Sequence, residues 1–337
     1  MGLLKARYVT ATLLLMLVSC PLVAISLGSA EITIQEAFGA ILRLLGLLSN
    51  TSENQILNDK IVLELRLPRI IIAMLCGAGL AISGAVLQCV TRNPLADPYL
   101  FGISSGASLG AIMAITGGIL FFSVPICAFL GSLTAVVVVM CMSRTAQTEN
   151  LVLAGVATSF LLSSIANLIL YFSDPSAIQA VLFWSLGSFS HVGLNDLLYP
   201  TIIVMVGCVI IIGCQRSLYS LMVGNESAHT QGIAVIPLRL SMLIITALIT
   251  SSLVATCGGI GFVGLMVPHI SRMLVGAAHP ASLIISAMLG AVLMLVVDVI
   301  TRVILPSQEL PVGVMTAMLG SVFFIFLLFK RENGVAK

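Results

Sequence analysis

Residues 66–90 read RLPRIIIAMLCGAGLAISGAVLQCV. Beyond the two arginines near its start, this stretch carries no charge, and it exceeds the roughly 20 apolar residues that a helix needs to cross a bilayer. Ala73 and Gly77 lie four residues apart, and Gly79 and Gly84 follow them. Small residues at such spacing let helix backbones approach closely where lipid supplies no hydrophobic drive. The stretch therefore predicts a membrane-spanning helix packed tightly among other helices.

The rest of the chain has the same apolar character. Of its 337 residues, 59% are hydrophobic and only 8% are charged, whereas soluble globular chains have about 45–50% apolar and about 25% charged residues. The net charge of +2 leaves no basic face that would attract a polyanion. These values exclude a soluble domain, a disordered chain and a nucleic-acid-binding protein.

Apolar runs between charged residues and Pro or Gly breaks predict about ten transmembrane helices. Their approximate bounds are 8–28, 66–90, 98–117, 120–142, 149–171, 197–213, 240–257, 260–277, 281–304 and 313–330. We therefore predict an all-α, polytopic integral membrane protein in which residues 1–337 form a single transmembrane domain.

The first of these runs also resembles a secretory signal. Lys5 and Arg7 precede it, and the sequence Leu-Val-Ser-Cys at 17–20 resembles a lipoprotein cleavage site. The apolar run continues to Leu27, however, which gives it the length of a membrane span. We expect an uncleaved transmembrane helix here.

The distribution of Lys and Arg predicts the orientation, because cytoplasmic segments carry more of these residues. With the N-terminus inside, ten of the 15 lie on the cytoplasmic side: Lys5, Arg7, Arg92, Arg144, Arg216, Arg239, Arg272, Lys330, Arg331 and Lys337. The other five lie outside: Arg43, Lys60, Arg66, Arg69 and Arg302. Both termini are therefore predicted to be cytoplasmic.

Residues that carry catalytic or metal chemistry are sparse. The eight cysteines form no CxxC pair and the four histidines form no HExxH motif, so we predict neither a metal site nor a disulfide framework. A phosphate-binding P-loop requires Gly-Lys before Ser or Thr, and no lysine of this chain follows a glycine. We predict that the chain is not an enzyme and holds no cofactor, so that any ATP-driven transport needs a separate ATPase subunit.

Two other functional classes are open on the residues alone. An ion-coupled carrier usually needs a carboxylate near the middle of the membrane. Asp298 and Arg302 are the main ionisable pair inside a predicted span, but they lie four residues apart near an outer helix end, where they can pair. A lipid-modifying enzyme needs clustered His, Asp or Glu at one interface, and His269 with Arg272 provides little of such a cluster.

Small and polar residues form a stripe on the predicted helix 149–171. The stripe consists of Gly155, Ser159, Ser163 and Asn167, each four residues after the last. Residues at this spacing share one helix face, which either lines a translocation path or supplies hydrogen bonds between helices. The last predicted span has a similar, shorter stripe that includes Thr316 and Gly320.

The link at about 214–239 is polar and lies on the cytoplasmic side by the charge count. It contains the residues Gly224, Glu226, Ser227, Ala228 and Gly232. This composition is polar enough to form a short helix-turn-helix outside the bilayer, whose small residues offer a face that docks in a cleft of another protein. An ordinary solvated loop is the alternative.

Five further segments occur together in one order and spacing. They are LRLPR at 65–69, NPLADP at 93–98, FWxxGS at 183–188, GFVGLxxPHxxR at 261–272 and ELPxGxxTAxxG at 309–320. With these motifs, essentially the whole chain resembles the permease subunit of the FecCD-type, binding-protein-dependent ABC importers for iron-siderophores, haem and cobalamin.

This resemblance implies a multi-pass subunit of the bacterial inner membrane that works as a homodimer, with a path along the two-fold axis. Two cytoplasmic ATPase subunits would bind ATP and Mg²⁺, and a periplasmic substrate-binding protein would dock on the outer side. ATP-driven alternating access would move a metal chelate, most often a ferric siderophore. Haem, cobalamin and an oxyanion such as molybdate stay open as substrates.

The resemblance also implies roles for individual residues. Arginines that meet glutamates of the binding protein correspond to Arg66, Arg69 and Arg302. The segment that seats in the ATPase cleft corresponds to 224–232, which favours the docking interpretation over the solvated loop. The two small-residue stripes correspond to helices that line the path. Asp97 before Pro98 instead resembles a helix N-cap.

Overall fold

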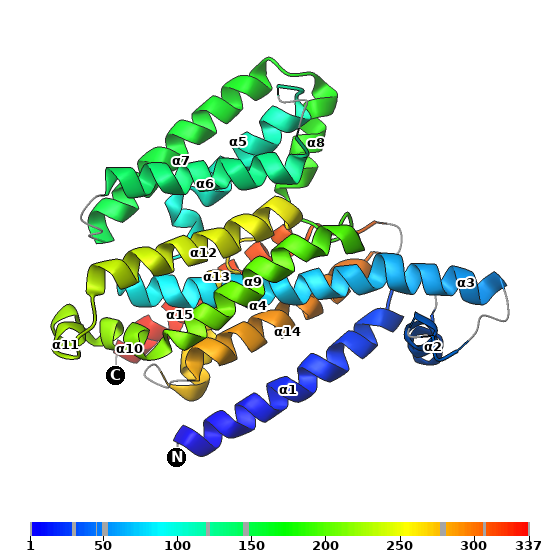
Figure 1. The fold of residues 1–337 in the computed structure, drawn as a ribbon, viewed down its shortest axis with the longest axis horizontal. Helices are drawn as coiled ribbons and strands as arrows, with labels where there is room; N and C mark the ends of the chain where they lie inside the picture. The colour runs from blue at the N-terminus through cyan, green and yellow to red at the C-terminus, as the bar shows by residue number, and fades with distance from the viewer. Residues whose placement is uncertain are drawn as a thin grey trace.

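The computed structural model describes residues 2–28, 32–44, 46–48, 53–118, 122–143, 148–276, 281–305 and 308–335. Within these ranges the chain is helical and forms no β-strand (Figure 1), as the sequence predicts. Arg144 and Lys337, which the charge count assigns to the cytoplasm, lie outside the described residues. The predicted span ends at 120 and 277 also lie outside them.

Eight helical segments of the described ranges are long and apolar enough to cross a membrane. The helices that form them are α1 (Gly2–Ser26), α4 (Leu67–Thr91), α6 (Val124–Met142), α7 (Thr148–Tyr171), α9 (Leu198–Gly213), α12 (Val235–Cys257), α14 (Ser282–Val303) and α15 (Val312–Val335). Two shorter apolar helices, α5 (Ile103–Ile115) and α13 (Val263–Val275), occupy the places of the third and eighth predicted spans. The helical elements thus follow the predicted order.

Left-handed backbone residues explain why α5 and α13 are shorter than predicted. Gly102 has φ 76° and Phe262 has φ 68°, and each residue immediately precedes its helix. The 3-10 turn η2 (Pro98–Phe101) fills the start of the third predicted span, and Asp97 caps it by accepting the Tyr99 N–H at 2.8 Å. The predicted N-cap role of Asp97 is confirmed.

Short helices occur where the sequence indicated only links. On the outer side by the charge count, α2 (Ile34–Leu44) and α3 (Glu53–Lys60) are joined by the ion pair between Arg43 and Asp59 at 2.6 Å. A π-helical turn, η1 (Ile61–Arg66), continues α3 into α4, and α8 (Pro175–Ser185) follows α7. The helix that ends as α4 therefore starts well before residue 66.

Helix α4 is the central element of the fold. It runs between α14 on one side and α9 and α12 on the other, while α5 to α8 form a separate group at one edge and α1 lies at the opposite edge (Figure 1). In the most apolar stretch of the segment that contains α4, 78% of residues are buried, against 17% for α1. Residues 66–90 therefore form the core around which the other helices pack.

Glycines bring the backbones of neighbouring helices into contact with α4. A Cβ atom at Gly77 would overlap the carbonyl group of Gly290 in α14, and a Cβ atom at Gly84 would overlap Gly264 in α13. Gln88, one turn after Gly84 in α4 and buried, donates its side-chain amide to the Gly264 carbonyl at 3.1 Å. These contacts confirm the predicted close packing of this helix.

Substitution of Gly77 by Ala is predicted to destabilise the protein, because the added methyl group must displace the backbone of α14. Overpacking of this kind costs about 1–3 kcal/mol, which should appear as a lower melting temperature in detergent. The matched control is Gly213→Ala in α9, where an added Cβ meets nothing within 4 Å. An equal melting temperature for the two variants would contradict the packing argument.

Candidate functional site

A cluster of charged side chains lies where α4 begins and α14 ends. The Arg69 guanidinium donates from Nε to Oδ1 of Asp298 at 2.7 Å and from Nη1 to both carboxylate oxygens of Glu309, at 2.7 and 2.8 Å. Asp298 is fully buried, whereas the side chain of Glu309 is 49% exposed. Arg69 therefore links the buried end of α14 to the segment that leads into α15.

Two further arginines complete this outer cluster. Arg302 pairs with the second carboxylate oxygen of Asp298 at 3.0 Å and donates to the Leu27 carbonyl at 3.1 Å. Arg66 donates to the Ile25 carbonyl at 2.6 Å. The predicted pairing of Asp298 with Arg302 is confirmed, and the outer cluster also holds the end of α1 against α4 and α14.

The structure thus brings together Arg66, Arg69 and Arg302, the three arginines predicted to face a binding protein. Each of them donates to acceptors of its own chain, and the side chains of Arg69 and Arg302 are only 8% and 6% exposed. Glu309 is the most exposed acceptor of Arg69. The sequence showed Glu309 only as part of a motif, because a partner 240 positions away in the chain leaves no local signal.

The other end of α4 holds the polar link. Arg92 ends α4 in a left-handed conformation with φ 51°. Its Nε donates to the Leu221 carbonyl at 3.2 Å and its Nη2 donates to the side chain of Asn225. Arg239 of α12 donates to the same Asn225 oxygen at 3.5 Å. One amide side chain therefore joins the polar link to both α4 and α12.

The polar link is a pair of short helices, α10 (Gln215–Val223) and α11 (Asn225–Thr230), separated by Gly224. This confirms the predicted helix-turn-helix. Ala228 is buried, Ser227 is half-buried and Glu226 is exposed, while Gly232 ends the pair in a left-handed conformation with φ 75°. Within the α10–α11 pair, α11 presents a small surface away from the other helices. The docking of this surface in a cleft of an ATPase subunit stays a prediction.

Side-chain hydrogen bonds make the α10–α11 pair compact. Ser220 donates to the Gln231 side chain at 2.5 Å, so α10 is tied to the end of α11. The Tyr219 hydroxyl bonds to Ser282 at the start of α14 at 2.6 Å. Burial raises the pKa of Tyr219, which keeps this hydroxyl protonated. Side-chain bonds therefore connect the α10–α11 pair to α4, α12 and α14.

The predicted stripe on α7 faces the α5 region over most of its length. Gly155 is buried against the backbone of Leu100, and Ser163 donates to the Ser105 hydroxyl at 3.2 Å. Ser159 is half-buried beside Gly102, and Asn167 is exposed. Within this chain the stripe supplies contacts between helices, and its role in a path stays a prediction.

The small-residue stripe on α15 also makes its contacts within this chain. Thr316 is buried and donates to the Gly313 carbonyl at 3.0 Å, within its own helix. Gly320 is buried against the side chain of Phe262, the left-handed residue before α13. A side chain larger than hydrogen at residue 320 would collide with that ring. Gly320 therefore fixes how closely α15 approaches α13.

Comparison with known proteins identifies a protein family that matches this chain. The sequence model of the FecCD transport family matches residues 13–330. The Yersinia pestis hemin transport system permease protein HmuU is 35% identical over 323 residues, which is 93% of this chain and 94% of HmuU. The Haemophilus influenzae molybdate import system permease protein MolB is 32% identical over 327 residues, which is 96% of this chain and 95% of MolB.

A solved structure has the same fold. It is described as an inward-facing conformation of a metal-chelate type ABC transporter. The match covers 96% of this chain and 99% of the chain in that structure, with a TM-score of 0.84 and 30% sequence identity. Similarity over nearly the full length of each protein means that the outer cluster and the α10–α11 pair lie in the part of the chain that matches.

Replacement of Asp298 by Ala is predicted to be strongly destabilising, because it leaves the guanidinium groups of Arg69 and Arg302 without their shared buried partner. Removal of one member of a buried pair costs about 3–5 kcal/mol. Thermal unfolding in detergent measures this loss. The control is Glu309→Ala, which removes a half-exposed partner of Arg69 and should cost much less. Equal losses for the two variants would contradict the central place given to Asp298.

Proposed function

The chain belongs to the FecCD transport family, and on that premise we propose that it is the permease subunit of an ABC importer that carries a metal chelate into the cytoplasm. One observation carries this proposal: a single buried helix, α4, connects a charged outer cluster at Arg69 with an inner helical pair at Arg92. A subunit with attachment points at both ends of one rigid helix suits the transmission of force across a membrane.

The proposed assembly contains more than this chain. Two copies form the pathway, and two cytoplasmic ATPase subunits bind ATP and Mg²⁺ and receive α11 in a cleft. A periplasmic substrate-binding protein docks at the outer cluster. The setting is a bacterial inner membrane, with both termini in the cytoplasm. This agrees with the positive charges at both ends of the sequence.

The net charge of the outer cluster suits the docking of an acidic partner. Three arginines and two carboxylates leave it with an excess of positive charge. Exposed charge pairs contribute only about 0.2–1 kcal/mol each, so the excess would steer and orient an acidic partner more than hold it. The internal bonds of Arg69 and Arg302 keep the surface rigid, which lowers the entropic cost of docking.

The proposed mechanism is alternating access. Closure of the ATPase dimer moves α11, and the contacts of Asn225 with Arg92 and Arg239 pass the motion to α4 and α12. The pathway between the two copies, with the stripes of α7 and α15 near it, then opens to one side of the membrane. A loaded binding protein covers the other side.

The substrate proposed first is a ferric siderophore. The relatives include a hemin permease and a molybdate permease, so haem and an oxyanion are the alternatives within the same class, together with cobalamin. Family membership does not decide among them, because the sequences of permeases for chemically different substrates are about equally similar to this chain.

Uptake into proteoliposomes tests the proposal. The permease is reconstituted with its ATPase and binding protein, and labelled ferric chelate, haem, cobalamin and molybdate are compared with and without internal ATP. We expect ATP-dependent accumulation of one of them. Uptake that ignores ATP and the binding protein but follows a proton gradient would instead establish an ion-coupled carrier.

Replacement of Arg92 by Ala is predicted to separate ATP hydrolysis from uptake, because α11 loses its bond to α4. A hydrogen bond to a charged group contributes about 1.5–3 kcal/mol, so uptake per ATP should fall about tenfold or more. Arg216→Ala is the control, since it removes the same charge from an exposed position of α10. Loss of ATPase activity in parallel with uptake would contradict a coupling role for Arg92.

A further inference from the structure

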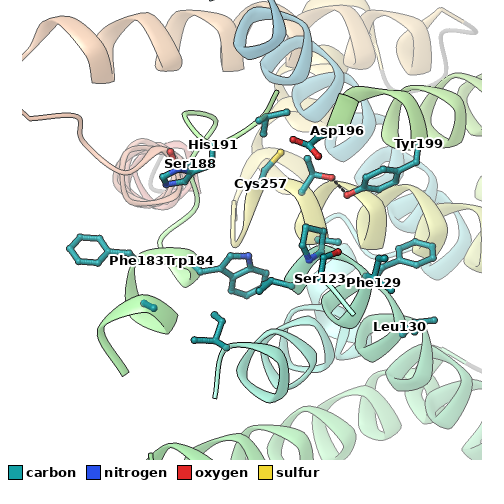
Figure 2. A pocket seen from close by; sticks show the side chains of 18 residues that line it. Ser123, Phe129, Leu130, Phe183, Trp184, Ser188, His191, Asp196, Tyr199 and Cys257 are labelled. Carbon is teal, nitrogen blue, oxygen red and sulfur yellow. Dashed lines mark hydrogen bonds between the residues drawn. The ribbon is translucent and has the colours of Figure 1, made fainter. Parts of the chain in front are cut away.

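A cavity of about 620 Å³ lies among the start of α6, the helix α8, the start of α9 and the end of α12. Figure 2 shows Trp184 at its centre, with Tyr199 and Asp196 on one side and Ser188 and His191 on the other. Cavities of about 300–1,000 Å³ are typical of ligand sites. The cavity is large enough for a compact metal chelate, and none of the roles described above uses it.

The cavity belongs to the outer half of the protein. By the charge count, α6 and α9 start outside, α12 ends outside and α8 lies outside. The wall of the cavity is also bonded to the outer cluster region, because Ser188 donates its N–H to Cys257 at 2.8 Å and Val312, at the start of α15, donates to Gly187 at 3.0 Å. A substrate released by a docked binding protein would thus meet this cavity on the same side.

Two acidic or phenolic side chains of the cavity offer acceptor oxygens. Thr256 donates its hydroxyl proton to the Ser252 carbonyl at 2.8 Å, so the hydroxyl of Tyr199 is the donor in the bond between these two side chains. The lone pairs of Tyr199 then remain available to a ligand. The exposed carboxylate of Asp196 adds a negative charge at the rim.

Positive charge is scarce in the cavity. Among the described residues that line it, none is Lys or Arg, and His191 is the one basic side chain. The remaining surface is largely apolar and includes Phe129, Leu130 and the Trp184 ring. An anion placed here would lose hydration without gaining a cationic partner, and that transfer is costly. A neutral or cationic ligand would not face this cost.

We propose that this cavity admits a neutral or cationic metal chelate with an apolar exterior, such as a ferric tris-hydroxamate, and disfavours anionic cargo. The inference rests on the proposed import function and narrows its substrate. Three singly deprotonated hydroxamates neutralise Fe(III), whereas three doubly deprotonated catecholates leave a trianion. The propionates of haem and the oxygens of molybdate also carry negative charge. The charge of the lining therefore separates the hydroxamate complex from the anionic substrates that the family leaves open.

Trp184 is the only tryptophan of the chain, so its fluorescence reports directly on the cavity. The purified full-length permease in lipid nanodiscs is titrated with a ferric tris-hydroxamate, a ferric tris-catecholate, haem and molybdate. Bound coloured chelates quench the emission by energy transfer. For molybdate, which has little colour, the readout is competition with the hydroxamate. We expect saturable quenching by the hydroxamate at concentrations about tenfold or more below those for the anions.

A charge variant and its matched control test whether the charge of the cavity rim causes the preference for the hydroxamate complex. Asp196→Lys should weaken the hydroxamate preference and improve binding of the catecholate, because it places a cation at the rim. Asp174→Lys makes the same change at the start of α8, outside the lining, and should leave the preference unchanged. Equal effects of the two variants, or quenching by the hydroxamate that does not saturate, would overturn the proposal.

The reconstituted importer separates this inference from the proposed function. ATP-dependent uptake of the hydroxamate complex, with reduced uptake in Trp184→Ala and normal ATPase activity, supports both. ATP-dependent uptake of only an anionic substrate overturns the cavity inference and leaves the importer intact. No ATP-dependent uptake of any substrate overturns the proposed function, while the fluorescence titration still decides whether the cavity binds the chelate.

Discussion

The contact between the backbones of α4 and α14 at Gly77 and Gly290 is the constraint on which the rest of the structure depends. In a membrane, helices gain little from hiding apolar side chains from lipid, so close packing must hold them together. Glycine removes the Cβ atoms that would keep the two helices apart, and Gly84 repeats the arrangement with α13. Because α4 is enclosed in this way, its two ends are fixed relative to each other across the membrane.

The two ends of α4 use arginine for different purposes. At the outer end, Arg69 is hydrogen-bonded to the buried Asp298, and the cost of taking this pair out of water is offset by the attraction of two guanidinium groups, Arg69 and Arg302, to one carboxylate. At the inner end, Arg92 bonds to one carbonyl and one amide, which carry no net charge. The outer attachment is therefore rigid and the inner one is easier to rearrange, and this difference suits a fixed docking surface above a moving coupling segment.

The sequence predicts what depends on composition and local spacing. The order of the apolar helices, the cap at Asp97 and the pairing of Asp298 with Arg302 are all confirmed, because each rests on residues close in the chain. The shortness of α5 was not predicted, and the exact start of α13 was not either, since a left-handed Phe262 has no signature in hydropathy. The bond between Arg69 and Glu309 and the cavity at Trp184 arise only from tertiary packing. The docking, coupling and path roles stay predictions, because they require partners outside this chain.

The parts that would transmit force and the parts that would select substrate obey different physical limits. Backbone contacts at Gly77 and Gly84 tolerate no added atom, so any change there moves whole helices. The wall of the cavity is lined by side chains such as Phe129, Leu130 and Trp184, and a change of size there meets other side chains rather than a helix backbone. One framework can therefore serve cargo of different charge. The similarity of this chain to both a hemin and a molybdate permease agrees with that separation.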